Sequence, residues 1–193
     1  MENKFMKSFF DSYKSSLKSQ IDIIDTLELE KIINELINCE KSGSNVYIIG
    51  NGGSSATASH MENDLGVGLK RREILDLNIQ SLSNNVAVIS ALANDVGYEN
   101  IFYWQIKDQI KKSDILIAIS CSGSSPNIIK AVTYAKDYGA TIVGLTGFDG
   151  GKLLNLSDIN FHVDTEKGHY GIVESMHIIL NHMLYTYFIN NEN

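Results

Sequence analysis

The chain has 193 residues, of which 44% are hydrophobic and 20% are charged. This length and composition suit one globular domain with a substantial core. The net charge of −7 and the lack of a basic run argue against a nucleic-acid-binding protein. They do not exclude a phosphate ligand, because backbone amides can bind phosphate without Lys or Arg.

Signals for membranes, secretion and disulfides are weak. The longest apolar runs, such as residues 115–119, are far shorter than the roughly 18 residues of a membrane span. The first residues are too mixed in character for a signal peptide. Two cysteines, Cys39 and Cys121, are too few for a disulfide framework or a zinc site built from cysteines. We therefore expect a cytoplasmic protein with no membrane partner.

Hydrophobic spacing predicts a long helical region near the N-terminus, over about residues 5–39. Apolar side chains recur there at steps of three and four residues, and the segment 41–45 ends the pattern. The region starts with bulky aromatic side chains that could pack on a partner subunit or on the chain's own sheet. These are Phe5, Phe9, Phe10 and Tyr13.

Short apolar strands then alternate with helices. This alternation predicts a parallel sheet covered by helices on both faces. In such sheets, ligands bind outside the carboxyl ends of the strands. The predicted strands are residues 46–49, 75–79, 114–119, 141–145 and 159–163, and the predicted helices are 54–65, 86–93, 98–110, one starting at 126, and 172–189.

The first loop that follows a strand, residues 50–55, reads Gly-Asn-Gly-Gly-Ser-Ser. Its glycines allow a ligand to approach the backbone, and the helix that follows offers free N–H groups and the positive end of its dipole. The loop lacks the Gly-x-Gly-x-x-Gly spacing of a dinucleotide site and the lysine of a P-loop. A phosphate-bearing ligand and a simple tight turn both remain open.

The second loop, residues 120–125, reads Ser-Cys-Ser-Gly-Ser-Ser and has the same position after a strand. Its four serine hydroxyls beside backbone amides suit a phosphate monoester and need no cationic side chain. A cluster that caps the helix starting at Pro126 is the alternative, but one serine suffices for a cap. We interpret Cys121 as a packing residue, because no histidine lies near it in the sequence.

Histidines and carboxylates form the third feature. His60 and Asp64 are four residues apart on the helix after the first loop, so they share a face. Glu174 and His182 lie two turns apart on the last helix. Two imidazoles and two carboxylates can bind zinc or move protons as an acid/base pair. Two other histidines, His162 and His177, are interpreted as structural.

The order of these motifs along the chain carries a resemblance. The segments that carry it are Gly50–Ser54, His60, Asn94–Tyr98, Ile119–Gly123, Leu145–Gly151, His177 and His182. In this combination the chain resembles the bacterial phosphoheptose isomerases (sedoheptulose 7-phosphate isomerases), a family of the sugar-isomerase (SIS) domain superfamily. The likeness runs from the first helix to the last.

The resemblance implies an α/β fold, namely a flavodoxin-like three-layer αβα sandwich with a central, mainly parallel five-stranded sheet. It implies a single SIS domain over residues 1–193, in which residues 1–40 form a helical region for packing and oligomerisation. It also implies a homotetramer with its sites at subunit interfaces, and one zinc ion per subunit. The implied reaction is the aldose–ketose isomerisation of sedoheptulose 7-phosphate to D-glycero-D-manno-heptose 7-phosphate through an enediol, in heptose biosynthesis for lipopolysaccharide or capsule.

Residue roles follow from the same resemblance. The residues implied to bind the sugar phosphate are Asn51, Gly52, Gly53, Ser54, Asn94, Asp95, Ser120, Cys121, Ser122, Ser125 and Glu174. The implied metal ligands are His60, Asp64, Glu174 and His182. The implied catalytic groups are Asp64 or Glu174 as the base and His182 as the acid or proton shuttle.

Four positions depart from the family pattern: Cys121 stands where Thr is common, Gly171 replaces an Asp, and the other two bear on the proposed chemistry. The family has Glu where this chain has Asp64, and Gln where this chain has Glu174. Aspartate is one methylene shorter, so a glutamate at the facing position could restore the reach of the pair. Which carboxylate moves the proton stays open. Two other functions also stay open: an isomerase of another phosphosugar, and a non-catalytic module that binds a phosphosugar or a protein.

Overall fold

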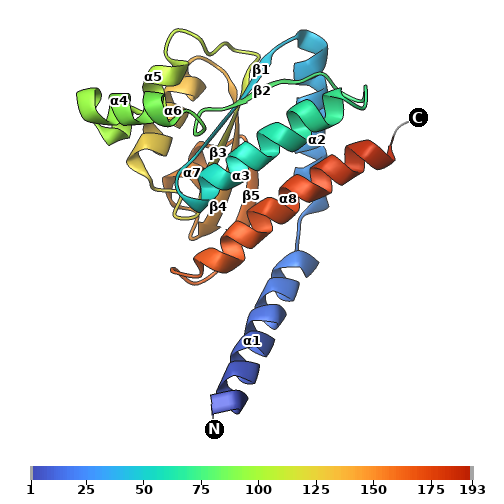
Figure 1. Ribbon diagram of the computed structural model, residues 1–193. Coiled ribbons are helices and arrows are strands. Elements are labelled where there is room, and N and C mark those ends of the chain that lie inside the picture. Colours follow the sequence, from blue (N-terminus) through green and yellow to red (C-terminus); the bar gives the residue numbers. More distant parts are fainter. Residues whose placement is uncertain (1, 192–193) are drawn as a thin grey trace.

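The computed structural model describes residues 2–191 and shows five strands in one sheet with helices on both faces (Figure 1). The strands are β1 (Asn45–Gly50), β2 (Asn78–Ser81), β3 (Ile115–Ser120), β4 (Thr141–Phe148) and β5 (Ile159–Asp164). The helices are α1 (Glu2–Asp22), α2 (Thr26–Ser42), α3 (Gly53–Met61), α4 (Val86–Val96), α5 (Tyr103–Ile106), α6 (Pro126–Asp137), α7 (Gly151–Leu156) and α8 (Tyr170–Asn190). A π-helical segment, Glu62–Gly68, continues α3, and a 3₁₀ turn, Tyr98–Asn100, follows α4.

The strand order of the sheet is β2-β1-β3-β4-β5, and every pair is parallel. This is the flavodoxin-like order, so the predicted fold is confirmed. The order reverses between β1 and β3, where ligands bind in folds of this kind. Gly50 at the end of β1 pairs with Ile119 near the end of β3. The two loops singled out in the sequence therefore start at neighbouring points on one edge of the sheet.

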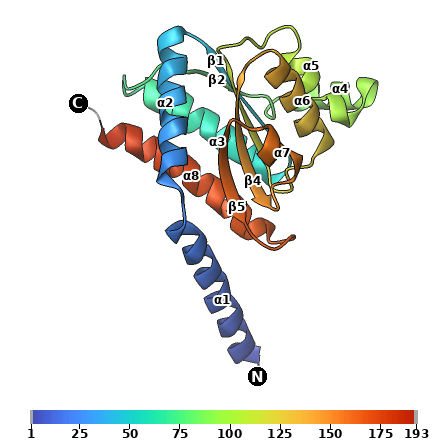
Figure 2. The same cartoon turned by 180° about the vertical axis from the view of Figure 1, so that it is seen from behind.

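The core consists of two apolar layers, one on each face of the sheet. Alternate residues of β1 point to opposite faces: Val46 and Ile48 belong to one layer, and Tyr47 and Ile49 belong to the other. Helices α2, α3 and α8 cover the first face, and α5, α6 and α7 cover the second (Figure 2). This continuous burial explains why the central strands are apolar without interruption.

The predicted N-terminal helical region is broken into two helices. Asp25 caps α2, because its carboxylate accepts a backbone N–H at 2.9 Å. Helix α1 extends away from the rest of the molecule (Figures 1 and 2), and its Phe5, Phe9 and Phe10 are exposed. Among residues 2–191, no helix combines the length and the apolar character that a membrane span requires.

Two predicted elements differ from those observed. The strand expected over 75–79 lies at Asn78–Ser81, because β1 sets the register and pairs its Asn45 with Asn78. The helix expected over 98–110 is reduced to a 3₁₀ turn and the four-residue α5. Asp108 has a positive φ of 61°, a conformation that no continuous helix contains.

A buried histidine joins α8 to the sheet. His177 is fully buried, and its Nε2–H donates to the carbonyl oxygen of Thr146 on β4 at 3.2 Å. Burial lowers the pKa of His177 from 6.5 to about 4. The imidazole is therefore neutral in the folded protein at pH values where an unfolded chain binds a proton.

This pKa predicts a loss of stability in acid. As the pH falls from about 6.5 to about 4, the unfolded state gains a proton that the folded state excludes, which costs up to about 3 kcal/mol. The variant His177→Gln can still donate to Thr146 but does not titrate, so we expect it to lose this contribution. Denaturant unfolding of both proteins at about pH 7.5 and pH 5 measures the difference. An equal loss of stability in both proteins would contradict the prediction.

Candidate active site

The helices that follow the two loops begin without side-chain caps. Gly52 and Ser125 occupy the cap positions of α3 and α6, and neither supplies a side-chain hydrogen bond to its helix. By contrast, Asp25 and Asn85 cap α2 and α4 with their side chains. The hydroxyl of Ser125 instead lies 3.3 Å from the hydroxyl of Ser120. The hydroxyls of Ser120 and Ser125, at the two ends of the second loop, thus lie close together, where a bound anion can use them.

The second loop packs tightly against the turn after β4. Gly147 N–H donates to the carbonyl oxygen of Cys121 at 3.0 Å, and Leu153 N–H donates to that of Gly123 at 2.9 Å. Gly123 has a φ of 56°, and a Cβ at this position would overlap the carbonyl oxygen of Gly150. Both the backbone conformation and the space therefore require glycine here.

Cys121 lies in the middle of this loop and is buried. Burial, and next the negative charge of Glu174, raise the pKa of the Cys121 thiol to about 11. The thiol is therefore protonated at neutral pH and is not activated as a nucleophile.

An amide network ties the first loop to its neighbours. The side chains of Asn51 and Asn127 exchange two hydrogen bonds, at 3.0 and 2.9 Å. The Tyr98 hydroxyl donates to Asn51 Oδ1 at 2.9 Å. Asn51 Oδ1 thus accepts two hydrogen bonds, while its amide nitrogen keeps one N–H for a ligand. Asn127 was not predicted from the sequence, where its only signal is its place in the first turn after the second loop.

Two predicted binding residues lie near the end of α4. Asn94 and Asp95 are both exposed, and Asn94 Nδ2 donates to Asp95 Oδ1 at 2.9 Å. Tyr98, three residues further on, is the point at which this part of the chain contacts the first loop.

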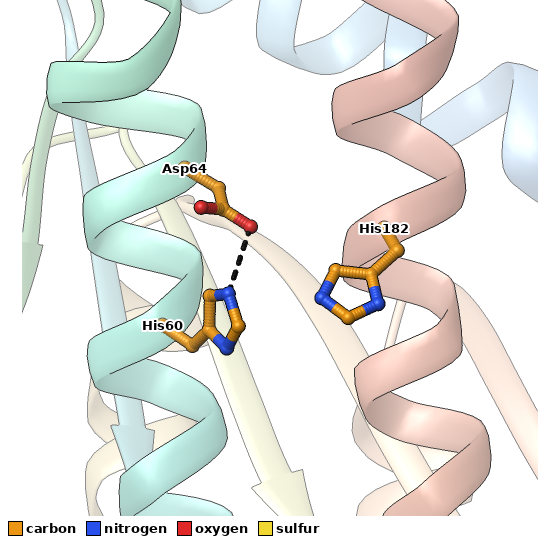
Figure 3. Close-up of side chains that lie close together, drawn as sticks. All are labelled: His60, Asp64 and His182. Atoms are coloured by element: carbon orange, nitrogen blue, oxygen red, sulfur yellow. Dashed lines mark ion pairs between the residues drawn. The ribbon is translucent and has the colours of Figure 1, made fainter.

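Three of the predicted metal ligands lie together between α3 and α8 (Figure 3). Ligand atoms of His60, Asp64 and His182 all lie within 4.8 Å of one another. His60 Nε2 is 3.1 Å from Asp64 Oδ2, and the rings of His60 and His182 have centroids 5.1 Å apart. The structure therefore confirms that His60 and Asp64 lie on the same face of the helix.

Asp64 belongs to the π-helical segment, which is a feature common at functional sites. Two glycines let this segment lie close to its neighbours. A Cβ on Gly66 would be 2.6 Å from the Ile79 side chain, and one on Gly68 would be 3.0 Å from the Tyr185 ring. The segment is thereby pressed against β2 and α8, and Asp64 is buried beside α8.

Glu174, the fourth predicted ligand, is not grouped with these three residues. Its carboxylate lies against Gly53 at the start of α3, where a Cβ would overlap it. Within residues 2–191 it forms no ion pair and no hydrogen bond with another side chain. The two predicted carboxylates therefore have different surroundings, one beside the histidines and one beside the first loop.

The histidine cluster suits zinc by its chemistry. Two imidazoles and one carboxylate form a ligand set found in catalytic zinc sites, which keep a fourth position for water or substrate. The side chain of His60 is 45% exposed, so a ligand has access to the cluster.

Comparison with known proteins identifies the family of this chain. The SIS domain family model matches residues 8–147. The phosphoheptose isomerase of Aliarcobacter butzleri (strain RM4018) is 34% identical, and the match covers 100% of this chain and 98% of that protein. The chain belongs to the phosphoheptose isomerase family. The phosphoheptose isomerase of Helicobacter pylori (strain P12) is 35% identical, with 95% and 94% of the two chains covered.

A solved structure gives the same fold for another named phosphoheptose isomerase. That of Neisseria gonorrhoeae superposes with a TM-score of 0.85 over 98% of this chain and 100% of that chain, at 23% identity. The sandwich and its all-parallel sheet are thus the fold seen in that protein.

In this chain of the phosphoheptose isomerase family, an apolar groove adjoins the histidine cluster. It lies between α2 and α8 and has a volume of about 620 Å³. Leu29 and Ile33 of α2 and Met183 of α8 contribute to its walls, as does His182. His182 thus belongs both to the cluster and to the wall of this groove.

Proposed function

We propose that this protein is an aldose–ketose isomerase that converts sedoheptulose 7-phosphate to D-glycero-D-manno-heptose 7-phosphate. The observation that carries the proposal is the grouping of the hydroxyl-rich second loop, the Glu174 carboxylate against the start of α3, and the histidine cluster further along α3. His60 lies about 10 Å along the helix from Gly53, given a rise of 1.5 Å per residue. A seven-carbon sugar phosphate carries its phosphate and its carbonyl group at opposite ends, so both can be bound at once.

The loops bind the phosphate and the sugar hydroxyls in this proposal. Serine hydroxyls, loop amides and the remaining N–H of Asn51 hold the substrate at a distance from the reacting carbons. Binding energy from this end positions the C1–C2 end of the sugar between the Glu174 carboxylate and the cluster. The proposed binding residues are Asn51, Gly52, Gly53, Ser54, Asn94, Asp95, Ser120, Cys121, Ser122 and Ser125.

The cluster holds zinc in this proposal, through His60, Asp64 and His182. Zinc at this place supplies Lewis-acid polarisation of the substrate carbonyl group. The position of Glu174 against Gly53 favours a role for its carboxylate other than that of a fourth ligand.

We assign the base to Glu174. Both oxygens of Asp64 are engaged, since Oδ1 accepts from Asn63 at 3.0 Å and Oδ2 faces His60 and accepts from Asn181 at 2.7 Å. The Glu174 carboxylate has no such partner within residues 2–191. In the reaction, Glu174 removes a proton from C1 of the ketose, the C–H electron pair forms the C1=C2 bond of the enediol, and the proton returns at C2. The hydroxyl proton passes from O1 to O2 through Glu174 or solvent, because the His182 nitrogen that would bind zinc cannot also carry a proton.

A substrate panel tests this function against its alternatives. Sedoheptulose 7-phosphate and shorter ketose phosphates are incubated with the zinc-loaded protein, and aldose phosphate formation is measured. We expect the highest kcat/KM for the seven-carbon substrate. Preference for a shorter sugar would identify an isomerase of another phosphosugar. Binding without turnover of any of them would favour a non-catalytic phosphosugar-binding module.

We further propose a cytoplasmic homotetramer with its sites at subunit interfaces, acting in heptose biosynthesis for lipopolysaccharide or capsule. Two features support the assembly. Helix α1, the first of the two helices in the predicted N-terminal helical region, exposes Phe5, Phe9 and Phe10. The apolar groove between α2 and α8 reaches His182, so a partner seated there would adjoin the cluster. Light scattering of the purified protein measures its mass, and a monomer would contradict the proposal.

A further inference from the structure

An asparagine with unusual surroundings lies directly behind the cluster. Asn181 precedes His182 on α8 and is fully buried. Its Nδ2 donates to Asp64 Oδ2 at 2.7 Å. Its Oδ1 is also buried and has no hydrogen-bond partner within residues 2–191. The hydrogen bond to Asp64 is thus the one polar contact of this side chain in the described part of the chain.

Packing does not explain an amide at this position. A buried carbonyl oxygen without a partner costs about 1–3 kcal/mol. The neighbouring inward-facing residues of α8, Leu180 and Leu184, are apolar and buried in the core. An apolar side chain at position 181 would fill similar space without that cost. The amide is therefore explained by what its donor group does to Asp64.

The Asp64 oxygen that accepts from Asn181 shows what this hydrogen bond does. Asp64 Oδ2 is the same atom that lies 3.1 Å from His60 Nε2, so the Asn181 bond fixes the carboxylate edge that faces the cluster. A hydrogen bond to a carboxylate is stronger than one between neutral groups. A neutral amide also leaves the negative charge of Asp64 in place, whereas Lys or Arg would compensate it. The carboxylate is thus oriented and keeps its attraction for a cation.

We propose that Asn181 is a positioning residue that prearranges Asp64 for zinc. The proposal rests on the zinc site of the proposed function and adds a residue that does not itself contact the metal. Groups that hold a metal ligand in place typically change metal affinity 10–100-fold when they are mutated. Asn63, which is exposed and donates to the other oxygen of Asp64, cannot substitute for this contact.

The direct test is zinc affinity, measured by competition with a chromophoric chelator on the metal-free protein. Asn181→Leu keeps the number and branching of the side-chain heavy atoms and removes the donor, so we expect zinc binding to weaken about 10–100-fold. Asn190→Leu is the matched control, because this exposed asparagine lies nine residues further along α8 and should leave the affinity unchanged. Asn181→Ser, too short to reach Asp64, should show the same weakening and serves if the leucine variant does not fold.

A double-mutant cycle tests whether Asn181 acts through Asp64. In an Asp64→Ala background, Asn181→Leu should cause no further loss of zinc affinity. Full additivity of the two losses, or wild-type affinity in both Asn181 variants, would overturn the proposal while leaving the zinc site intact. If the wild-type protein itself binds no zinc, the proposed metal site is wrong and this proposal fails with it.

Discussion

Replacing Glu174 with glutamine is expected to lower kcat for the isomerisation by about 10²–10⁴-fold, the range typical for loss of a general base. Glutamine keeps the shape of the side chain and removes its ability to accept a proton. Because Glu174 lies against Gly53 and outside the histidine cluster, zinc affinity should stay close to that of the wild type. Steady-state kinetics and chelator competition on the same protein measure the two quantities.

Asp64→Asn is the matched variant, since it makes the same change from carboxylate to amide on the other side of the site. We expect it to weaken zinc binding, because it removes the negative charge beside His60 and His182. The base would be Asp64 instead if the Glu174→Gln protein turns over substrate normally while the Asp64→Asn protein loses turnover and still binds zinc.

Replacing Gly123 with alanine is expected to damage both stability and substrate binding. The positive φ of 56° alone costs an L-residue about 1–2 kcal/mol. The added Cβ would also overlap the carbonyl oxygen of Gly150, so the second loop must move away from the turn after β4. We expect the free energy of unfolding to fall by more than the cost of the positive φ alone. We also expect KM for the sugar phosphate to rise at least about tenfold, which is the effect of losing one charge-assisted hydrogen bond to the phosphate.

Gly43→Ala separates the two causes. Gly43 has a similar φ of 65°, but a Cβ added there would meet no atom within 4 Å, and the residue ends α2 on the far side of β1 from the loops. This variant should lose only the φ cost and keep its KM. Equal effects of the two substitutions on stability, with KM unchanged in both, would show that the second loop does not depend on its contact with Gly150.

The sequence was sufficient for the framework of the site. Uninterrupted apolar runs at 46–49 and 115–119 predict buried parallel strands, and parallel strands place their following loops at one edge of the sheet. The four-residue spacing of His60 and Asp64 survives in the structure because α3 continues directly into the π-helical segment. Such spacings within one helix or strand can be predicted because they depend only on the number of residues per turn of that helix or on the alternation of that strand.

The parts that could not be predicted depend on contacts between distant segments. Glu174 could be placed on α8 from its spacing, but its contact with Gly53 depends on how α8 crosses α3. Asn181 fits a helical pattern only as a polar residue at a buried position, and its partner Asp64 is 117 residues away. Asp25 caps α2 and so separates it from α1. The apolar spacing continues across this break, so the sequence pattern does not show it. The period of a helix does not predict which side chains of two distant segments will contact each other.

The measurement that tests the account most directly is proton NMR of the zinc-loaded protein with sedoheptulose 7-phosphate in D₂O. If the proton is transferred through an enediol, we expect a new anomeric signal from the aldose phosphate. Because the base exchanges its proton with solvent, we also expect deuterium at the reacting carbons. Deuterium uptake without aldose would mean that the proton-transfer groups function on a different preferred substrate. The account would be contradicted if the sugar phosphate binds and neither the aldose signal nor deuterium appears.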